Sequence, residues 1–309
     1  MTQSGGSGPV LLVSSAGGHF TELRLLADQF EIPLEQRHWV LPRTPQTEGM
    51  ADQTVTWMPH VTSRDVRGAL TNLPRALRLH RQVRPSGVVT AGAAQAIPHL
   101  VAASAHRTPI TFVESAARTQ GPSVSGRVAQ RLPGAALRSQ TAAFGPRWSV
   151  LPDVFGRFLV QPASPRPIDR ILVSLGTERF PFERAVRAVM GAAQSATSVV
   201  WQTGNTTVEH AGAPLRQWLT PAQLHSELDR ASVVVVHGGV GAILDAFGAG
   251  HVPVVIPRSP EWGEHVDDHQ LTMCRSLAER GMIVMVSPGE TLTEGHLQRA
   301  AALQTIGPV

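Results

Sequence analysis

One stretch of this sequence, residues 232–270, restricts the fold more than any other. It opens with the β-branched run Val233–Val236, which predicts a short strand buried on both faces. Glycines separate this strand from the apolar, helix-like run Ala242–Phe247. The glycine-rich turn consists of His237, Gly238, Gly239 and Gly241. Such a turn lets a ligand approach the backbone, and the N–H groups of a helix start favour an anion, most often a phosphate.

Polar residues follow the two strands of this stretch at the point where each strand ends. Asp245 lies one turn into the helix, where its carboxylate can accept hydrogen bonds from vicinal hydroxyls such as those of a ribose. A second strand, Val252–Ile256, leads into the acidic, histidine-containing turn Glu261–Gln270. Two strand ends that deliver polar groups to one edge of a parallel sheet indicate a nucleotide site. The alternative is a buried βαβ unit whose glycines serve packing alone, but the convergence of Gly, Asp and His favours the nucleotide site.

Length and composition describe a globular protein with two domains. A chain of 309 residues exceeds the usual size of one hydrophobic core. Its 42% hydrophobic and 16% charged residues argue against a disordered chain. No apolar run approaches the roughly 18–20 residues of a membrane span, and no signal peptide precedes the first strand, so we expect a cytoplasmic protein. The single cysteine, Cys274, excludes an internal disulfide and a cysteine-rich metal site.

The basic residues are all arginine, 27 in number, and they are unevenly distributed. The absence of lysine from the sequence excludes a P-loop, a kinase phosphate lysine and Schiff-base or pyridoxal chemistry. Residues 1–165 carry 16 Arg against 9 acidic residues (+7), whereas residues 166–309 carry 11 Arg against 14 (−3), which gives the net charge of +4. The basic first half predicts an anionic partner such as phospholipid, diphosphate or nucleic acid.

Strand-like and helix-like segments alternate through both halves of the chain. A proline-rich segment, Gln161–Pro167, interrupts this alternation and marks a domain boundary. We therefore expect a flexible tail (1–8), a first domain (9–163) and a second domain (164–309). Each domain should be a Rossmann-like, doubly wound α/β sheet, the two facing a cleft. A last helix near Glu294–Gln304 could pack back on the first domain, and the absence of a G-x-G-x-x-G fingerprint argues against redox chemistry.

The segment Arg64–Arg84 predicts a long amphipathic helix. Val66, Leu70, Leu73 and Leu77 share one face, and six arginines lie elsewhere. A crossover helix with a solvated basic face is the simplest interpretation. Peripheral contact with an anionic membrane is the alternative, because the helix belongs to the basic half.

A cluster of acidic and histidine residues in the second half resembles a metal site in composition. It comprises Glu264, His265, Asp267, Asp268 and His269. Acidic residues also suit the N-terminus of a helix electrostatically, and we predict this role rather than metal binding.

Several motifs together resemble a known family. ILVSLGTERFPFERAV, VVHGGVGAILDAFGAGHVPVVIPR and DDHQ resemble the catalytic subunit of the eukaryotic dolichol-linked UDP-GlcNAc transferase. LLVSSAGGHFTELRLL and FVESAARTQGPSVSGRVAQRLPGAALRSQ resemble its membrane-recruiting partner subunit and bacterial exopolysaccharide homologues. Both are akin to the MurG-like GT-B glycosyltransferases of family 28. The chain thus resembles a fusion of the two subunits over Pro9–Gln304, but it lacks the partner subunit's N-terminal membrane helix, and its first turn has fewer glycines than that of MurG.

The resemblance implies roles for particular residues. Asp245 occupies the position of a glutamate that binds the ribose hydroxyls, and Glu114 that of a glutamate facing the cleft. The residues implied to lie beside the donor phosphates are Gly176, Thr177, His237, Gly238, Gly239 and Gly241. The pair implied to face the donor sugar is His269 and Gln270, and the acceptor-side loop is Gly17, Gly18 and His19.

The implied reaction is inverting transfer of a sugar of GlcNAc, glucose, galactose or glucuronate type from a UDP-sugar to a polyprenyl-diphosphate-linked sugar. No metal or other cofactor and no nucleic-acid partner is expected. The alternatives are a soluble natural-product acceptor, a UDP-GlcNAc 2-epimerase or hydrolase, and a non-catalytic binding module. His19 is the first candidate for the base that removes the acceptor proton, because the reference pKa of histidine is about 6.5, and Glu114 is the second. Glu114 could instead be a structural carboxylate bonded to backbone N–H groups.

Overall fold

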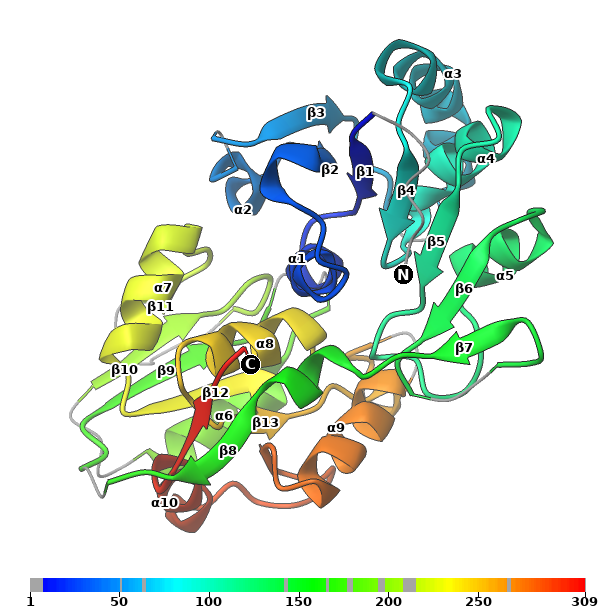
Figure 1. Cartoon of the computed structure of the whole chain (residues 1–309). Helices are drawn as coiled ribbons and strands as arrows, with labels where there is room; N and C mark the ends of the chain where they lie inside the picture. Colours follow the sequence, from blue (N-terminus) through cyan, green and yellow to red (C-terminus); the bar gives the residue numbers. More distant parts are fainter. Residues whose placement is uncertain are drawn as a thin grey trace. The chain divides into compact units, whose positions relative to one another are not determined.

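The chain divides into two compact units, each with its own parallel sheet (Figure 1). The computed structural model describes residues 8–50, 52–62, 65–141, 144–164, 167–176, 180–193, 198–207, 215–265 and 268–308. The units are Met1–Val154 and Phe155–Val309. The predicted fold class, α/β with two doubly wound sheets, is confirmed.

The first unit contains a seven-stranded parallel sheet in the order β3-β2-β1-β4-β5-β6-β7. Its strands are β1 (Val10–Val13), β2 (Arg37–Pro42), β3 (Thr54–Met58), β4 (Gly87–Thr90), β5 (Ile110–Val113), β6 (Ala136–Ser139) and β7 (Trp148–Val150). Its helices are α1 (Gly18–Gln29), α2 (Pro45–Glu48), α3 (Val66–Val83), α4 (Ile97–Ala105) and α5 (Val124–Arg131), with 3-10 turns Leu34–Gln36 and Ala94–Ala96. The strand order reverses between β1 and β4, and ligands of such sheets bind beyond the carboxyl ends of the strands at this switch point.

The second unit repeats this plan with six parallel strands in the order β11-β10-β9-β12-β13-β14. The strands are β9 (Arg170–Ser174), β10 (Ser198–Gln202), β11 (Leu215–Arg216), β12 (Val233–His237), β13 (Val254–Ile256) and β14 (Val284–Met285). The helices are α6 (Glu183–Ala192), α7 (Pro221–Arg230), α8 (Val240–Gly248), α9 (His269–Glu279) and α10 (Glu294–Ala301), with 3-10 turns Val154–Arg157 and Pro260–Trp262. Here the switch point lies between β9 and β12.

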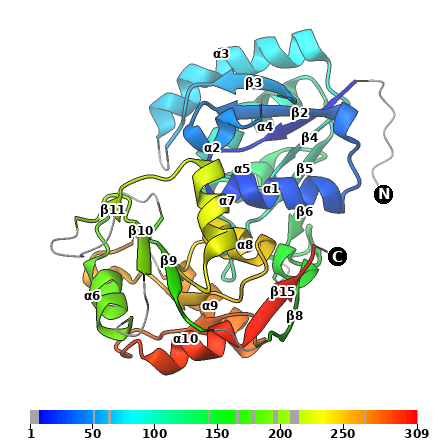
Figure 2. The ribbon, with the colours of Figure 1, turned by 90° about the vertical axis from the view of Figure 1, so that its left-hand side faces the viewer.

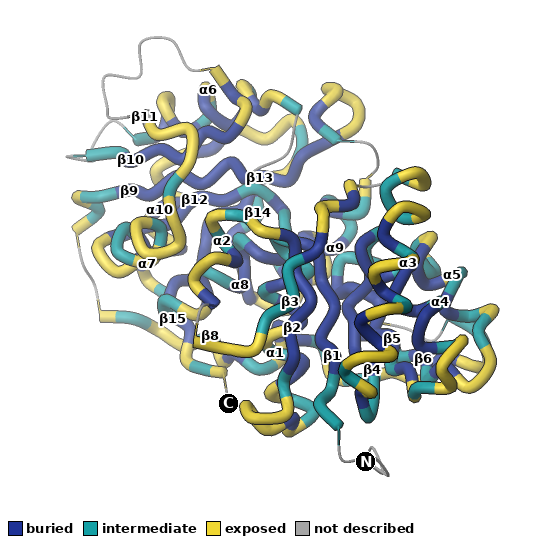
Figure 3. The backbone as a smooth tube through the Cα atoms, turned by 90° about the horizontal axis from the view of Figure 1, so that it is seen from above, coloured by how far each residue is buried: buried dark blue, intermediate teal, exposed yellow. Residues whose placement is uncertain are grey.

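The central strands of both sheets are buried on both faces (Figure 3). In β12 the four valines Val233–Val236 are each at most 2% exposed, as the β-branched run predicted. In each unit a core cluster joins alternate residues of the strands to the helices that cover one face of the sheet. The helices carry their exposed faces outward. At each switch point, short apolar strands are followed by polar residues at the carboxyl edge of the sheet.

The division between the units falls nine residues earlier than the predicted boundary at residues 163/164. Phe155 and Phe158 are buried against Phe247 of α8, with ring centroids 6.2 and 5.3 Å apart. Strand β8 (Leu159–Pro162) then pairs antiparallel with β15 (Leu303–Ile306) (Figures 1 and 2). Pro162, one of the prolines that suggested a linker, is the last residue of β8. A proline is tolerated there because β8 is an edge strand.

The predicted last helix, Glu294–Gln304, is shorter than expected and ends at Ala301. The last residues of the predicted helix, from Leu303 on, instead begin β15, which pairs with β8. Leu297, Ala300 and Ala301 of α10 belong to the core of the second unit. The helix therefore packs on the sheet of its own unit.

The predicted basic helix is α3. Asp65 caps it, with its Oδ1 accepting a hydrogen bond from Gly68 N at 2.7 Å, and Arg64 lies outside the described residues. None of the helices in the described ranges combines the length and apolar character needed to cross a bilayer.

Candidate functional site

The start of α8 presents unsatisfied backbone donors at the switch point of the second sheet. Gly239 is the N-cap residue and supplies no side chain to cap the helix. Within the part of the chain that the structure describes, the N–H groups of Val240, Gly241 and Ala242 find no acceptor. Three such donors and the positive end of the helix dipole create a site for an anion, with phosphate as the best fit.

Glycines on both sides make room for the ring of His237. Gly176, the second residue after β9, has φ +78°, and a Cβ there would lie 2.5 Å from His237 Cε1. A Cβ on Gly239 would lie 2.3 Å from His237 Nε2. The structure thus brings Gly176 and the His237–Gly239 turn together, as the sequence predicted. Thr177 lies outside the described residues.

His237 is a neutral imidazole at physiological pH. Burial, followed by repulsion from Arg258, lowers its pKa to about 4. Its Nδ1 lies 3.4 Å from the carbonyl oxygen of Ser174, which can only accept, so this contact requires the proton on Nδ1. Attraction for a phosphate at this turn consequently comes from the backbone of α8 and not from a charged His237.

The other residues predicted to bind the sugar donor differ in their surroundings. Asp245 is half-buried on α8, and His269 opens α9 with its ring edge-on to that of His265, 4.7 Å between centroids. Gln270 is buried, and its Oε1 accepts a hydrogen bond from Arg258 N at 3.3 Å. Gln270 also fills the space above Gly238, since a Cβ there would lie 3.2 Å from its Cβ. Its amide oxygen therefore faces the protein interior.

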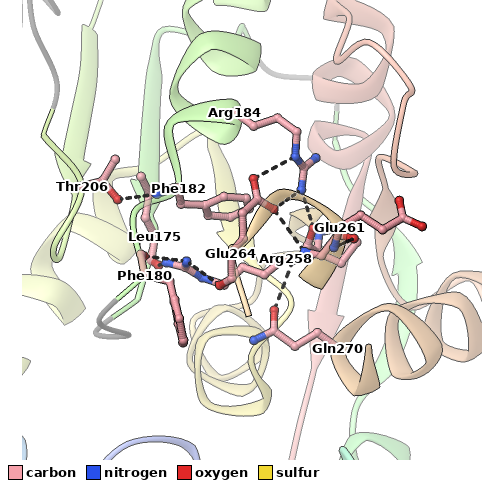
Figure 4. A network of polar contacts seen from close by, with 11 residues as sticks. Leu175, Phe180, Phe182, Arg184, Thr206, Arg258, Glu261, Glu264 and Gln270 are labelled. Atoms are coloured by element: carbon pink, nitrogen blue, oxygen red, sulfur yellow. Dashed lines mark hydrogen bonds and ion pairs between the residues drawn. The ribbon is translucent and has the colours of Figure 1, made fainter. Parts of the chain in front are cut away.

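Glu264 belongs to an ion pair. Its carboxylate accepts from Arg184 Nε at 3.1 Å and Nη2 at 2.8 Å, and from Ser259 N at 3.1 Å (Figure 4). The described ranges contain no group of three or more His, Cys, Asp or Glu side chains able to hold a metal ion, and Asp267 lies outside them. The pairing with Arg184 could not be predicted from the sequence, because the two residues lie on different elements 80 residues apart in the chain.

The acceptor-side loop of the first unit lies at its own switch point. Gly17, with φ +83°, is the N-cap of α1, and Gly18 and His19 begin that helix. The Nδ1 of His19 is 3.1 Å from the carbonyl oxygen of Ala91, which follows β4. A carbonyl can only accept, so the proton belongs on Nδ1, and Nε2 is the basic nitrogen of this half-buried ring.

Glu114 is buried and bonded to backbone. It is 2% exposed, and its Oε2 accepts from Ser123 N at 2.9 Å, directly before α5. Burial raises the pKa of this carboxyl group. These contacts match the structural role that the sequence left open for Glu114.

A second buried acid, Glu22 of α1, was missed by sequence reasoning. It is fully buried, and its Oε1 accepts from Ala116 N at 2.7 Å and from Gln140 Nε2 at 2.5 Å. Desolvation raises its pKa to about 7. Nothing in the sequence around Glu22 distinguishes it from a solvent-facing glutamate of an amphipathic helix.

Comparisons with known proteins agree with this arrangement. Residues 170–301 match the family model described as the glycosyltransferase family 28 C-terminal domain. A search of curated proteins finds no match.

Among solved structures, the chain is similar to MurG of Acinetobacter baumannii (15% identity, 96% of this chain and 94% of that chain, TM-score 0.57). It is also similar to the spinosyn rhamnosyltransferase SpnG complexed with thymidine diphosphate (18%, 95% and 90%, TM-score 0.57). A third similar structure is S. aureus MnaA with UDP (12%, 96% and 92%, TM-score 0.58). At these identities the likeness establishes the fold, which is GT-B. The chain therefore has the GT-B fold over nearly its whole length, and residues 170–301 of its second unit match the C-terminal domain of glycosyltransferase family 28.

Proposed function

We propose that this protein is an inverting glycosyltransferase that transfers a hexose from a UDP-sugar to a polyprenyl-diphosphate-linked sugar. The observation that carries the proposal is the start of α8, where three backbone donors lie at the switch point of a unit that matches the family 28 model. The similar structures of SpnG and MnaA are complexes with thymidine diphosphate and UDP, which supports a nucleoside diphosphate as the ligand.

The chemistry needs a base for the acceptor hydroxyl and stabilisation of the departing diphosphate. The N–H groups of Val240, Gly241 and Ala242 would bind the diphosphate as negative charge develops on it. His19, oriented through Nδ1 by the Ala91 carbonyl, would accept the proton on Nε2. Asp245 would accept hydrogen bonds from the ribose hydroxyls.

A lipid-linked acceptor is favoured by the resemblance of the first half to membrane-recruiting subunits and by its charge of +7 against −3 in the second half. A soluble natural-product acceptor is the second candidate, since SpnG is named as a spinosyn rhamnosyltransferase. UDP-GlcNAc 2-epimerase or hydrolase activity is the third.

The decisive experiment measures UDP release from a panel of UDP-sugars, with and without a short-chain polyprenyl-diphosphate sugar. Release only in the presence of the lipid acceptor, with an inverted glycosidic bond in the product, is the expected result. Sugar turnover without any acceptor would instead indicate an epimerase or hydrolase. UDP binding without sugar chemistry on any acceptor would indicate a binding module.

UDP should stabilise the protein, and Asp245→Ala should reduce this effect. At a concentration 100 times its Kd, a ligand contributes about 2.7 kcal/mol to stability. Loss of a hydrogen bond to a charged group costs about 1.5–3 kcal/mol, so we expect a 10- to 100-fold weaker Kd for the variant. Thermal unfolding at increasing UDP concentrations measures the stabilisation by UDP and the Kd. Asp229→Ala, on the exposed side of α7, is the matched control. An unchanged UDP shift in Asp245→Ala would remove Asp245 from the ribose site.

The exposed face of α3 is the proposed membrane contact, which would place the protein at the cytoplasmic surface of the membrane. Val66 and Leu70 are 70% and 64% exposed there. Arg75, Arg78 and Arg81 are exposed on the same helix. Arginines near an anionic surface contribute about 1 kcal/mol each, so replacing these three with Gln should weaken vesicle binding about 100-fold.

Sedimentation with vesicles that contain phosphatidylglycerol measures this binding, which should also weaken with salt. Replacing Arg187, Arg275 and Arg299, which are exposed in the second unit, with Gln provides the control. Equal binding to neutral and anionic vesicles would contradict the contact and favour a soluble acceptor.

A further inference from the structure

A fully buried arginine, Arg258, lies two residues after β13 and is 1% exposed. Its Nη1 donates to the carbonyl oxygens of Phe180 at 2.8 Å and Glu264 at 3.2 Å, and its Nη2 donates to that of Leu175 at 2.9 Å. Figure 4 shows the guanidinium reaching the backbone of Leu175 and Phe180. One side chain thereby joins the loop after β9 to the loop after β13, both at the edge of the sheet where α8 begins.

The geometry explains why this residue is arginine. The guanidinium is planar and carries donors in a fixed fork, so it can serve several carbonyls at once, whereas a lysine ammonium is a compact charge without that fork. The guanidinium carbon also lies 4.5 Å from the centre of the Phe182 ring. Buried charges persist in proteins when hydrogen bonds of this kind replace water.

Arg258 is linked to the His237–Gly239 turn on two sides, in each case through neighbouring residues. On one side, Leu175 precedes Gly176, whose missing Cβ makes room for the ring of His237. On the other, the backbone N–H of Arg258 donates to Gln270 Oε1, and Gln270 packs on Gly238. The His237–Gly239 turn is therefore enclosed by groups that Arg258 holds. Its charge also acts at this turn, because repulsion from Arg258 contributes to the low pKa of His237.

We propose that Arg258 is a positioning residue for the diphosphate: it fixes the loops on both sides of the His237–Gly239 turn so that the first N–H groups of α8 converge on one anion. The proposal rests on the assignment of this turn to a nucleoside diphosphate. It adds a residue whose side chain acts through the Leu175 carbonyl, while its backbone N–H holds Gln270.

Arg184 supplies a matched comparison. It is also an arginine of the second unit, it lies 5.3 Å from the Phe182 ring, and it belongs to the same network. Its bonds go to the Glu264 carboxylate and the Pro257 carbonyl, and its guanidinium lies 4.3 Å from the Trp262 ring. Arg184 thus secures the outer part of the loop after β13, and within the described residues none of its bonds goes to the loop after β9.

The test uses the full chain with Arg258→Met, Arg258→Lys and Arg184→Met. Affinities for UDP and for uridine, which lacks phosphates, are measured by calorimetry and NMR titration. Amide hydrogen exchange of residues 237–243 is measured without ligand. We expect Arg258→Met to weaken UDP binding about 100-fold and Arg258→Lys about 10-fold, with uridine binding changed less than about twofold. Exchange at the turn should rise in both, whereas Arg184→Met should leave UDP affinity and exchange at the turn near wild type.

Unchanged UDP affinity in Arg258→Met would overturn the proposal, as would an equal loss in Arg184→Met, which would indicate general loosening of the network. An equal loss for uridine and UDP would also overturn it. If Arg258→Met does not fold by circular dichroism, Arg258→Lys decides by the same criteria. If the wild-type protein binds neither ligand, the nucleotide assignment fails, and the exchange data alone decide whether Arg258 fixes the turn.

Discussion

Replacing His19 with alanine is expected to lower turnover about 10²- to 10⁴-fold while UDP affinity stays within about twofold of wild type. General base catalysis contributes factors of this size. The Nδ1 of His19 is held by the Ala91 carbonyl, so the side chain lost is one whose Nε2 is oriented and basic. The UDP-binding groups proposed here lie in the other unit, which is why binding and turnover should separate. Steady-state kinetics under saturating donor, together with UDP titration, measure the two effects.

His60→Ala provides the control for this experiment, because His60 is an exposed histidine of the same unit and is not among the residues proposed for the site. Its turnover should match wild type. Normal turnover in His19→Ala would show that His19 is part of the scaffold. Glu114→Gln would then be the next variant, although its buried carboxylate, bonded to Ser123 N, leads us to expect a loss of stability from that change.

Phe247→Ala should be the most destabilising change of the second unit, with an expected loss of about 3–5 kcal/mol in the free energy of unfolding. The ring is 1% exposed and packs edge-on against Phe155 and tilted against Phe158. Its removal leaves a cavity and also frees two aromatic rings of the segment that enters the unit. Urea denaturation followed by circular dichroism measures the loss. Met190→Ala, at a position 43% exposed, should change stability by less than about 1 kcal/mol, and an equally small effect of Phe247→Ala would show that these rings are loosely packed.

The parts of the site that follow directly from a strand and a glycine turn could be predicted from the sequence. A run of valines ending in His237 and glycines has few alternatives to a buried strand followed by a helix start, and the structure has this arrangement. Gly176 was assigned to the same site by the family resemblance, and the structure brings it beside that turn. The first of these predictions depends on local chemistry and the second on the resemblance.

Side-chain environments that depend on distant contacts could not be predicted. Gln270 was expected to face the donor sugar, yet its Oε1 accepts a buried hydrogen bond from a backbone N–H group. For Glu114 the sequence left a catalytic and a structural role open, and its hydrogen bond to Ser123 N matches the structural one. Arg258 gave no signal, because its partners are carbonyl groups, which every residue carries. The domain boundary was displaced for a similar reason: the pairing of β8 with β15 joins residues at opposite ends of the second unit, and no local pattern announces it.

That pairing has a practical consequence for handling the protein. Four residues near the carboxyl end, Leu303–Ile306, form the only strand partner recorded for β8 in the described chain. A polypeptide stopped after Ala301 would therefore release the connector Leu159–Pro162, although the deletion lies far along the chain from it. Truncations that remove these four residues would thus alter the passage from one domain into the other.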